Sequence, residues 1–380
     1  MRSCRAVSSL VVLLAAATFS SCHVHIARSG GDVHAQAEAA AANGRLLLVG
    51  GGLDDDTRSV YAELLAERDG RAANVVVATA ATGPEDVEAT DKSEALRAWA
   101  PTVPVAVVRR ATSTADTVAA LQQATAVFFT GGDQKRITER YRMGGASLPE
   151  RDALLAVLAR GGLVGGGSAG CAMMGERMLL GGRSAQALGV PDTSGDGEPA
   201  PVGPRLGQGM GFLPGVLTDS HFFERDRIGR LAAALHAGPD RLGLGVGEDA
   251  AVLVELASRT MVGVTPSESL LVDGTFAQRE GAVLFGLRAR VIAQGERLAI
   301  APLGTSAPAR VPAGAARLVP VVEPGQNRQL ASWRLFRHAM VPGSGVHELR
   351  CDGFLVRALP AGDGTVVFEL VADGVSAERR

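Results

Sequence analysis

The feature that most constrains the fold is a regular alternation of short apolar segments with segments of helical spacing. The apolar segments predict buried strands, and the spacing of apolar residues between them predicts helices. We expect strands at 45–49, 74–78, 103–108 and 126–130, and helices at 57–67, 84–99, 113–123 and 149–160. Such alternation is typical of an α/β fold with a mostly parallel sheet covered by helices on both faces. Ligands bind to such sheets at the carboxyl ends of the strands.

A glycine-rich run surrounds one serine at the end of a further apolar strand. Residues 165–170 read GGGSAG, and a segment compatible with a helix follows them. Glycines on both sides of a serine between a strand and a helix describe a nucleophile elbow, which lifts the Ser168 hydroxyl off the sheet. The backbone N–H of Ala169 would then face a developing oxyanion. A glycine-rich loop with a capping serine fits this motif, taken alone, equally well.

A histidine and three arginines follow a later strand. The strand at 216–218 leads to Asp219 and His221, and then to Arg225, Arg227 and Arg230. A histidine at a strand end is placed for work as a general base. The arginines are equally compatible with a solvated helix face that forms salt bridges.

Further downstream, two carboxylates interrupt an apolar run over residues 242–254. Glu248 and Asp249 would be costly to bury there unless they were paired or hydrogen-bonded.

Five motifs occur in order over residues 44–260, and together they resemble the cyanophycinase and dipeptidase E family of serine peptidases. The arginine cluster makes the resemblance to cyanophycinases the closer one, although Ser220 stands where their pattern has glutamine. The motifs are FTGGDQ (129–134), GSAG (167–170), GFLPG (211–215), DxHFxxRxRxxRL (219–231) and GEDxA (247–251). The resemblance implies a flavodoxin-like fold related to class I glutamine amidotransferases. It also implies hydrolysis at aspartyl residues, in cyanophycinases the β-linked aspartyl-arginine units.

The resemblance, together with the chemistry of the residues, suggests a role for each candidate. Ser168 is the expected nucleophile, His221 its base, and Glu248 the acid that orients the histidine, with Glu176 as the second choice. The N–H groups of Ala169 and Gly132 are expected to form the oxyanion hole. The residues expected to bind substrate are Gln134, Asp219, Arg225, Arg227 and Arg230. Arginine suits this task because its planar fork matches a carboxylate.

The N-terminal residues predict export from a bacterial cell. Arg2 and Arg5 precede an apolar run at 10–17, and small residues precede Cys22. This pattern describes a signal peptide over 1–22, and it resembles a lipoprotein box in which Cys22 carries a lipid anchor. Cleavage by ordinary signal peptidase near residues 35–37 is the alternative. Either outcome leads to a periplasmic, outer-surface or secreted protein.

We divide the chain into four parts: the signal peptide, a linker at 23–43, a peptidase domain at 44–300 and a β-rich C-terminal extension at 301–380. Of the four cysteines, Cys171 and Cys351 lie in the mature protein, where one disulfide could join them in an oxidising compartment.

The composition of the chain limits the kinds of molecule that it is expected to bind. The net charge is −2 and no basic block occurs, which argues against nucleic-acid binding. No metal-ligand spacing is present, so we expect no cofactor. The expected partner is a peptide substrate with aspartyl residues, and the sequence is compatible with a homodimer. The alternatives are a non-catalytic binding lipoprotein of the same fold, an α-aspartyl dipeptidase and another hydrolase such as an esterase.

Overall fold

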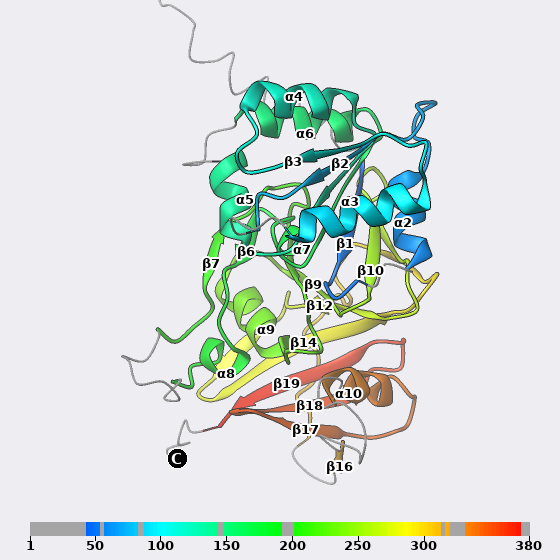
Figure 1. The fold of residues 1–380 in the computed structure, drawn as a ribbon. Coiled ribbons are helices and arrows are strands. Elements are labelled where there is room, and N and C mark those ends of the chain that lie inside the picture. Colours follow the sequence, from blue (N-terminus) through cyan, green and yellow to red (C-terminus); the bar gives the residue numbers. More distant parts are fainter. Residues whose placement is uncertain are drawn as a thin grey trace, which may run out of the picture. The chain divides into compact units, whose positions relative to one another are not determined.

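The computed structural model describes residues 43–53, 57–82, 87–142, 148–191, 201–312, 316–319 and 331–373. These residues form two large β-sheets with helices packed against them (Figure 1). The signal peptide, Cys22 and nearly all of the predicted linker lie outside the described residues. No helix in the described ranges is long and apolar enough to cross a membrane.

The first sheet has eight strands in the order β15-β11-β10-β1-β5-β4-β2-β3. Its five strands from β1 to β3 in this order are parallel, whereas β10, β11 and β15 pair antiparallel to their neighbours. The parallel strands are β1 (Arg45–Val49), β2 (Val75–Ala78), β3 (Val105–Val108), β4 (Ala126–Phe129) and β5 (Leu163–Gly167). The antiparallel strands are β10 (Ala251–Glu255), β11 (Thr260–Gly263) and β15 (Arg297–Ala299).

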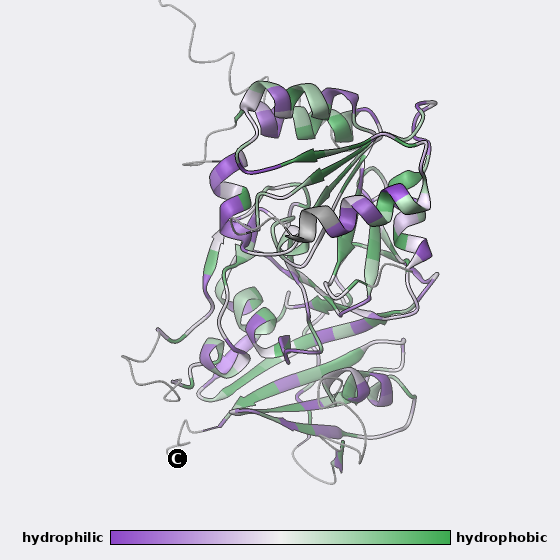
Figure 2. Ribbon diagram, in the orientation of Figure 1, coloured by the Kyte–Doolittle hydropathy of each residue, from purple (hydrophilic) through white to green (hydrophobic). Residues whose placement is uncertain are grey.

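Helices cover both faces of the parallel strands, as expected. Alternate residues of a strand point to opposite faces, and β1 shows the result. Leu46 and Leu48 share a core with α4 and α6, whereas Leu47 and Val49 share another with α2 and α3. Figure 2 shows the arrows of β2 and β3 coloured as hydrophobic, and β2 is buried along its whole length. The helices are α2 (Arg58–Leu65), α3 (Val87–Trp99), α4 (Thr114–Gln123), α5 (Gln134–Tyr141), α6 (Pro149–Ala159) and α7 (Ala169–Ala172).

Local sequence explains where several of these helices begin. The Ser113 side chain caps α4 by accepting a hydrogen bond from the N–H of Asp116. The Asp133 side chain caps α5 by accepting one from the N–H of Lys135. Pro149 opens α6, where its missing N–H costs no hydrogen bond.

The second sheet has nine strands, eight of them in the order β16-β17-β18-β19-β14-β12-β9-β8, with β13 paired to β14. The strands of this sheet that come before residue 300 are β8 (Val216–Asp219), β9 (Leu242–Val246), β12 (Ser269–Asp273), β13 (Gln278–Glu280) and β14 (Val283–Ile292). The strands that come after residue 300 are β16 (Arg317–Leu318), β17 (His347–Cys351), β18 (Phe354–Pro360) and β19 (Val366–Ala372). Helices α8 (Ser184–Ala187), α9 (Ile228–Ala237) and α10 (Ala331–Ala339) share the core of this sheet. The short strands β6 (Arg177–Leu179) and β7 (Leu206–Gln208) pair with each other.

The expectation of a mostly parallel sheet holds for five of the eight strands of the first sheet. Both large sheets are mixed, since in the second sheet only β8 with β9 and β16 with β17 pair in parallel. The apolar run at 242–254 is not one strand: β9 belongs to the second sheet and β10 to the first. The chain changes sheet at residues 247–250, where Glu248 and Asp249 stand. Both carboxylates therefore lie in the connection between two strands and not inside a strand, and this explains why they interrupt the apolar pattern.

The C-terminal strands continue the second sheet across the expected boundary at residue 300. β19 pairs with β14, so strands from both sides of that boundary share one set of hydrogen bonds. The expected β-rich character of this segment is present in β17, β18 and β19. The division into a domain and an extension stays a prediction.

The disulfide considered from the sequence does not form. Cys171 is buried in α7 and Cys351 lies at the end of β17, and no disulfide joins the two.

Candidate active site

The serine of the glycine-rich run stands at a sharp turn between β5 and α7. Ser168 has φ 52° and ψ −104°, a region that residues with a side chain seldom adopt. The two sides of the turn approach closely, because a Cβ on Gly166 would lie 2.6 Å from the Cα of Gly170. A Cβ on Gly170 would lie equally close to the carbonyl oxygen of Phe129. The glycines are thus a steric requirement, and the predicted nucleophile elbow is present.

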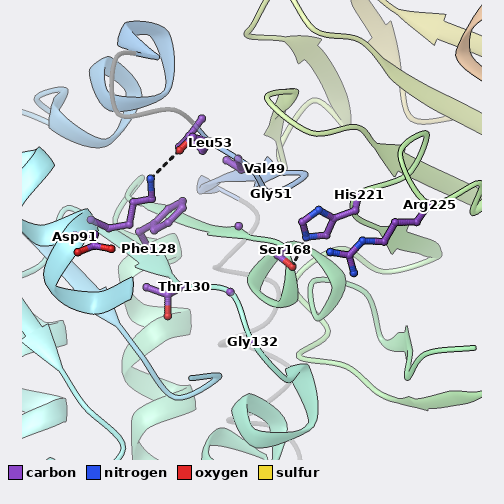
Figure 3. Close-up of a pocket in the computed structure, with 14 residues that line it drawn as sticks. Val49, Gly51, Leu53, Asp91, Phe128, Thr130, Gly132, Ser168, His221 and Arg225 are labelled. Atoms are coloured by element: carbon purple, nitrogen blue, oxygen red, sulfur yellow. Dashed lines mark hydrogen bonds between the residues drawn. The ribbon is translucent and has the colours of Figure 1, made fainter. Parts of the chain in front are cut away.

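Three side chains from distant parts of the sequence form one hydrogen-bonded chain. The Oγ atom of Ser168 lies 2.8 Å from Nε2 of His221, and Nδ1 of His221 lies 2.6 Å from Oε1 of Glu248. Figure 3 shows Ser168 and His221 side by side at the pocket, with their hydrogen bond drawn as a dashed line. A hydroxyl, an imidazole and a carboxylate in this order can move a proton away from the serine as it attacks.

The turn after β1 holds both the histidine and the acid in place. The N–H of His221 donates to the carbonyl of Gly50 at 2.8 Å, and the N–H of Asp249 donates to Gly51 at 3.0 Å. Gly51 has φ +110°, and a Cβ there would lie 2.3 Å from Cε1 of the imidazole. A Cβ on Gly52 would meet the side chain of Glu248 at 3.2 Å. The Gly50-Gly51-Gly52 turn is therefore the surface against which His221 and Glu248 pack.

The surroundings of His221 keep its imidazole neutral near pH 7. Burial is the largest cause of a lowered pKa, and the charges of Arg225 and Arg227 act in the same direction. The hydrogen bond to Glu248 opposes them by stabilising the imidazolium. The net effect is a pKa below the usual value of 6.5. At neutral pH the ring can therefore accept a proton from Ser168.

Ser168 and His221 line a cavity of 640 Å³ at the carboxyl ends of the parallel strands. Figure 3 shows Asp91, Phe128 and Thr130 across the cavity from His221 and Arg225. The lining residues are Val49, Gly51, Gly52, Leu53, Asp91, Lys92, Phe128, Thr130, Gly131, Gly132, Gly167, Ser168, His221 and Arg225. The loops after β1, β4 and β5 all contribute, as expected for the carboxyl ends of parallel strands.

Two backbone N–H groups near Ser168 are available to an oxyanion. Ala169 is the first residue of α7, and Gly132 lines the cavity. Neither N–H donates to a backbone acceptor in the described ranges. Gly132 has φ +132° and packs so closely that a Cβ would lie 2.2 Å from the carbonyl oxygen of Ala81. These are the two residues that the sequence suggested for an oxyanion hole.

The three arginines have different surroundings. Arg225 is exposed, and within the described residues its guanidinium makes no hydrogen bond or ion pair. Arg227 donates to the Ser220 carbonyl oxygen at 2.5 Å and lies 3.3 Å from Asp219. Arg230 is buried and binds Asp219 through two nitrogens, at 2.7 and 2.5 Å.

The expectation that Asp219 contacts a substrate is corrected by these contacts. Arg230 lines a second pocket with Arg225 and Arg227, but all three of its guanidinium nitrogens are already bonded, so its contact with a substrate stays a prediction. Asp219 has no exposed surface, and a third nitrogen of Arg230 donates to the carbonyl of Gly182. A buried carboxylate needs such a bidentate partner, so the two residues satisfy each other. Their pairing supports the end of β8, from which the chain continues to His221.

Two further expectations also differ from the structure. Gln134 is not among the residues that line the cavity, because its side-chain amide donates to the carbonyl of Leu179 at 2.5 Å. Glu176, the second choice for the acid, is exposed and lines a different pocket beside Arg142 and Phe212.

The wall of the cavity formed by α3 was not predicted. Asp91 and Lys92 line the cavity, and Lys92 donates to the carbonyl of Leu53 at 2.9 Å. Nothing in the sequence of α3 marks these residues, because charged residues on a helix normally face solvent.

The fold and this site define a class. A serine on a strand-to-helix elbow, bonded to a histidine that is bonded to a carboxylate, is the arrangement of serine hydrolases built on α/β sheets. Among the described residues, no group of three or more His, Cys, Asp or Glu is arranged to hold a metal ion.

Comparisons with known proteins narrow this class. No family model matches the chain. The chain is 30% identical to a cyanophycinase of Geminocystis herdmanii (strain PCC 6308) over 185 residues, which are 47% of the chain and 63% of the relative. It is 37% identical to a cyanophycinase of Synechococcus elongatus over 142 residues, 36% of the chain and 38% of the relative. A solved peptidase from an acI-B1 Actinobacterium is similar with a TM-score of 0.46 and 16% identity, over 68% of the chain and 97% of that structure.

The predicted resemblance to the cyanophycinase and dipeptidase E family is therefore confirmed. The aligned part of the chain spans less than two thirds of each of these curated relatives.

Proposed function

We propose that this chain is a serine peptidase that hydrolyses bonds formed by aspartyl residues, with β-linked aspartyl-arginine units as its substrate class. The observation that carries the proposal is the series of hydrogen bonds from Ser168 through His221 to Glu248, in which Ser168 and His221 line the cavity. The name of the curated relatives points to the same substrate class.

In the proposed reaction, Ser168 Oγ attacks the scissile carbonyl carbon while His221 Nε2 accepts the serine proton. The carbonyl oxygen becomes an oxyanion, which the N–H groups of Ala169 and Gly132 stabilise. His221 then gives the proton to the leaving amine, so that the C–N bond breaks and an acyl-enzyme remains. Water, deprotonated by His221, releases the acid product and restores the serine. Glu248 holds the imidazole orientation and stabilises the imidazolium that forms twice.

Arg225 is the proposed contact for a substrate carboxylate. Its guanidinium lines the same cavity as Ser168 and has no partner among the described residues. A β-aspartyl linkage leaves a backbone carboxylate free, and a guanidinium binds a carboxylate with two parallel hydrogen bonds. Arg227 lines a second pocket together with Arg225, and it contributes positive charge rather than a free fork, because Ser220 and Asp219 hold its guanidinium.

A comparison of substrates tests the proposed function. Purified protein is given cyanophycin, the dipeptide β-Asp-Arg and the dipeptide α-Asp-Arg, and arginine release is measured, with Ser168→Ala as the control. The proposal expects release from the β-linked substrates and none from the control. Cleavage of the α-linked dipeptide alone would favour an α-aspartyl dipeptidase. Binding of β-Asp-Arg without turnover would favour the non-catalytic alternative.

We further propose that the protein is exported and anchored through a lipid on Cys22, on the sequence pattern alone. Wild-type protein is then expected in the membrane fraction of a bacterial host and Cys22→Ala in the soluble fraction. Equal partition of the two would leave export without an anchor.

A further inference from the structure

Helix α10 belongs to the C-terminal segment that the family motifs do not reach, yet it contacts two loops of the site. It packs against β14, β17 and β18 of the second sheet (Figure 1). Its first turn carries Ser332 and Trp333, whose side chains donate hydrogen bonds outside the helix. Each bond is made to a residue beside one of the two loops that hold His221 and Glu248.

The first contact fixes the turn that carries the histidine. The Oγ atom of Ser332, which is 1% exposed, lies 3.3 Å from Oδ1 of Asp226. On its other side, Asp226 accepts a hydrogen bond at its carbonyl from Ser184 Oγ at 2.5 Å. Asp226 has φ 45° and directly follows Arg225, the free guanidinium of the cavity. The hydroxyls of Ser332 and Ser184 thus both bond to Asp226, whose backbone conformation sets the direction of Arg225.

The second contact fixes the corner that carries the acid. Nε1 of Trp333 donates to Oε2 of Glu268 at 2.6 Å, and Arg337 lies 3.4 Å from the other oxygen of that carboxylate. Glu268 lies opposite Gly247, since a Cβ on Gly247 would be 3.2 Å from the Glu268 carbonyl oxygen. Gly247 is the residue before Glu248. Trp333 therefore holds the residue directly before β12, against which the Glu248 corner packs.

We propose that α10 is a positioning element of the site, in which Ser332 orients the Arg225 turn and Trp333 orients the Glu248 corner. The inference rests on the proposed function and adds that the C-terminal segment tunes catalysis as well as stability. Side chains that position a catalytic group act through small displacements, and a shift of about 1 Å can cost up to about a hundredfold in rate. The two contacts should have separable effects, because one supports substrate binding and the other supports proton transfer.

The experiment measures two quantities for each variant. The first is the rate of labelling by an alkyl fluorophosphonate, in which Ser168 Oγ bonds to phosphorus, fluoride leaves and His221 takes the proton. The second is KM for β-Asp-Arg, with the enzyme concentration set by the labelled fraction. Trp333→Phe keeps the ring but loses the N–H donor, and we expect labelling about tenfold slower. Ser332→Ala should leave labelling within about twofold and raise KM about tenfold.

Two further variants separate positioning from stability. Val356→Ala removes a buried contact of the same core and should lower the melting temperature while keeping both measured quantities at wild-type values. Ser332→Thr keeps the hydroxyl and should restore the wild-type KM. Wild-type values in either Trp333→Phe or Ser332→Ala, or equal losses in Val356→Ala, would overturn the inference. Wild-type protein that is not labelled at all would instead contradict the proposed function, and the inference would fall with it.

Discussion

His221 is the residue whose surroundings decide when the site can work. It must be neutral to accept the proton of Ser168, and burial together with Arg225 and Arg227 lowers the pKa of its imidazole. Glu248 acts in the opposite direction by stabilising the imidazolium. When the pH falls through this lowered pKa, His221 becomes protonated and can no longer accept the proton of Ser168. The loss of activity on the acid side should therefore lie below pH 6.5.

Variants of the two opposing neighbours should move this limb in opposite directions. Arg225→Gln removes a charge that lowers the pKa of His221, so the acid limb of kcat/KM should move to higher pH. Glu248→Gln removes the partner that raises this pKa, so the limb should move to lower pH while kcat falls. The profile of kcat/KM reports the free enzyme and is the quantity to measure. Shifts of the same sign in both variants would refute this assignment of causes.

The arginines should separate into one that binds substrate and one that supports the fold. Arg225→Lys should raise KM for β-Asp-Arg by about tenfold with the melting temperature unchanged, because lysine lacks the bidentate fork. Arg230→Lys should instead destabilise the fold by about 2 kcal/mol, since it loses hydrogen bonds to the buried Asp219 carboxylate. Thermal unfolding and steady-state kinetics of both variants decide the matter. The opposite pattern would place the substrate contact at Arg230.

At the scale of elements, the site is built from five loops, each of which follows a strand. The turns after β1, β4 and β5 come from the parallel strands of the first sheet, and the turn after β8 comes from the second. The corner between β9 and β10 brings Glu248 to the same place because the chain there passes from one sheet to the other. Nucleophile, base and acid are therefore held by backbone hydrogen bonds between loops, with the β1 turn at the centre.

Gly51→Ala tests the central place of that turn. The new Cβ would lie 2.3 Å from the His221 ring, at a φ of +110° that strains any residue with a side chain. We expect kcat to fall by about a hundredfold or more, because the imidazole must move away from Ser168. Gly70→Ala is the matched control, since its φ is +69° but nothing lies within 4 Å of its Cβ. Equal activity of the two variants would mean that the histidine does not depend on this turn.

Sequence reasoning located the elements whose signals are local. The strands from β1 to β4 and the elbow at Ser168 follow from apolar runs and glycines that neighbouring residues alone dictate. The split of residues 242–254 between two sheets could not be predicted, because an apolar run looks the same in either sheet. The different roles of Arg225 and Arg230 were hidden for a similar reason. They depend on Asp219 and Gly182, which only the tertiary fold brings near.

At the scale of the whole molecule, residues on both sides of position 300 share one sheet and one core. Phe336, Phe354 and Phe368 come from the C-terminal segment and pack with Leu270, Leu287 and other residues from before it. Figure 1 shows β19 alongside β14, with β18 and β17 following in order. The C-terminal segment therefore supports β14, which in turn pairs with β12.

A chain that ends at residue 300 should fail to fold. It would expose the apolar side chains of β14 and leave that strand without its β19 partner. We expect insoluble protein, or soluble protein without a cooperative thermal transition, compared with the full chain prepared in parallel. A truncated chain that unfolds cooperatively and reacts with a fluorophosphonate would show that residues 44–300 are an independent domain.

The central claim is that Ser168, activated by His221 and Glu248, cleaves β-aspartyl bonds. Its most direct test is the turnover of β-Asp-Arg by wild-type protein, Ser168→Ala and His221→Ala, each shown to be folded by its thermal transition. We predict arginine release by the wild type and a loss in both variants of about 10⁶-fold in kcat, equal in the two because they act as one unit. Near-native turnover by folded Ser168→Ala would contradict the account.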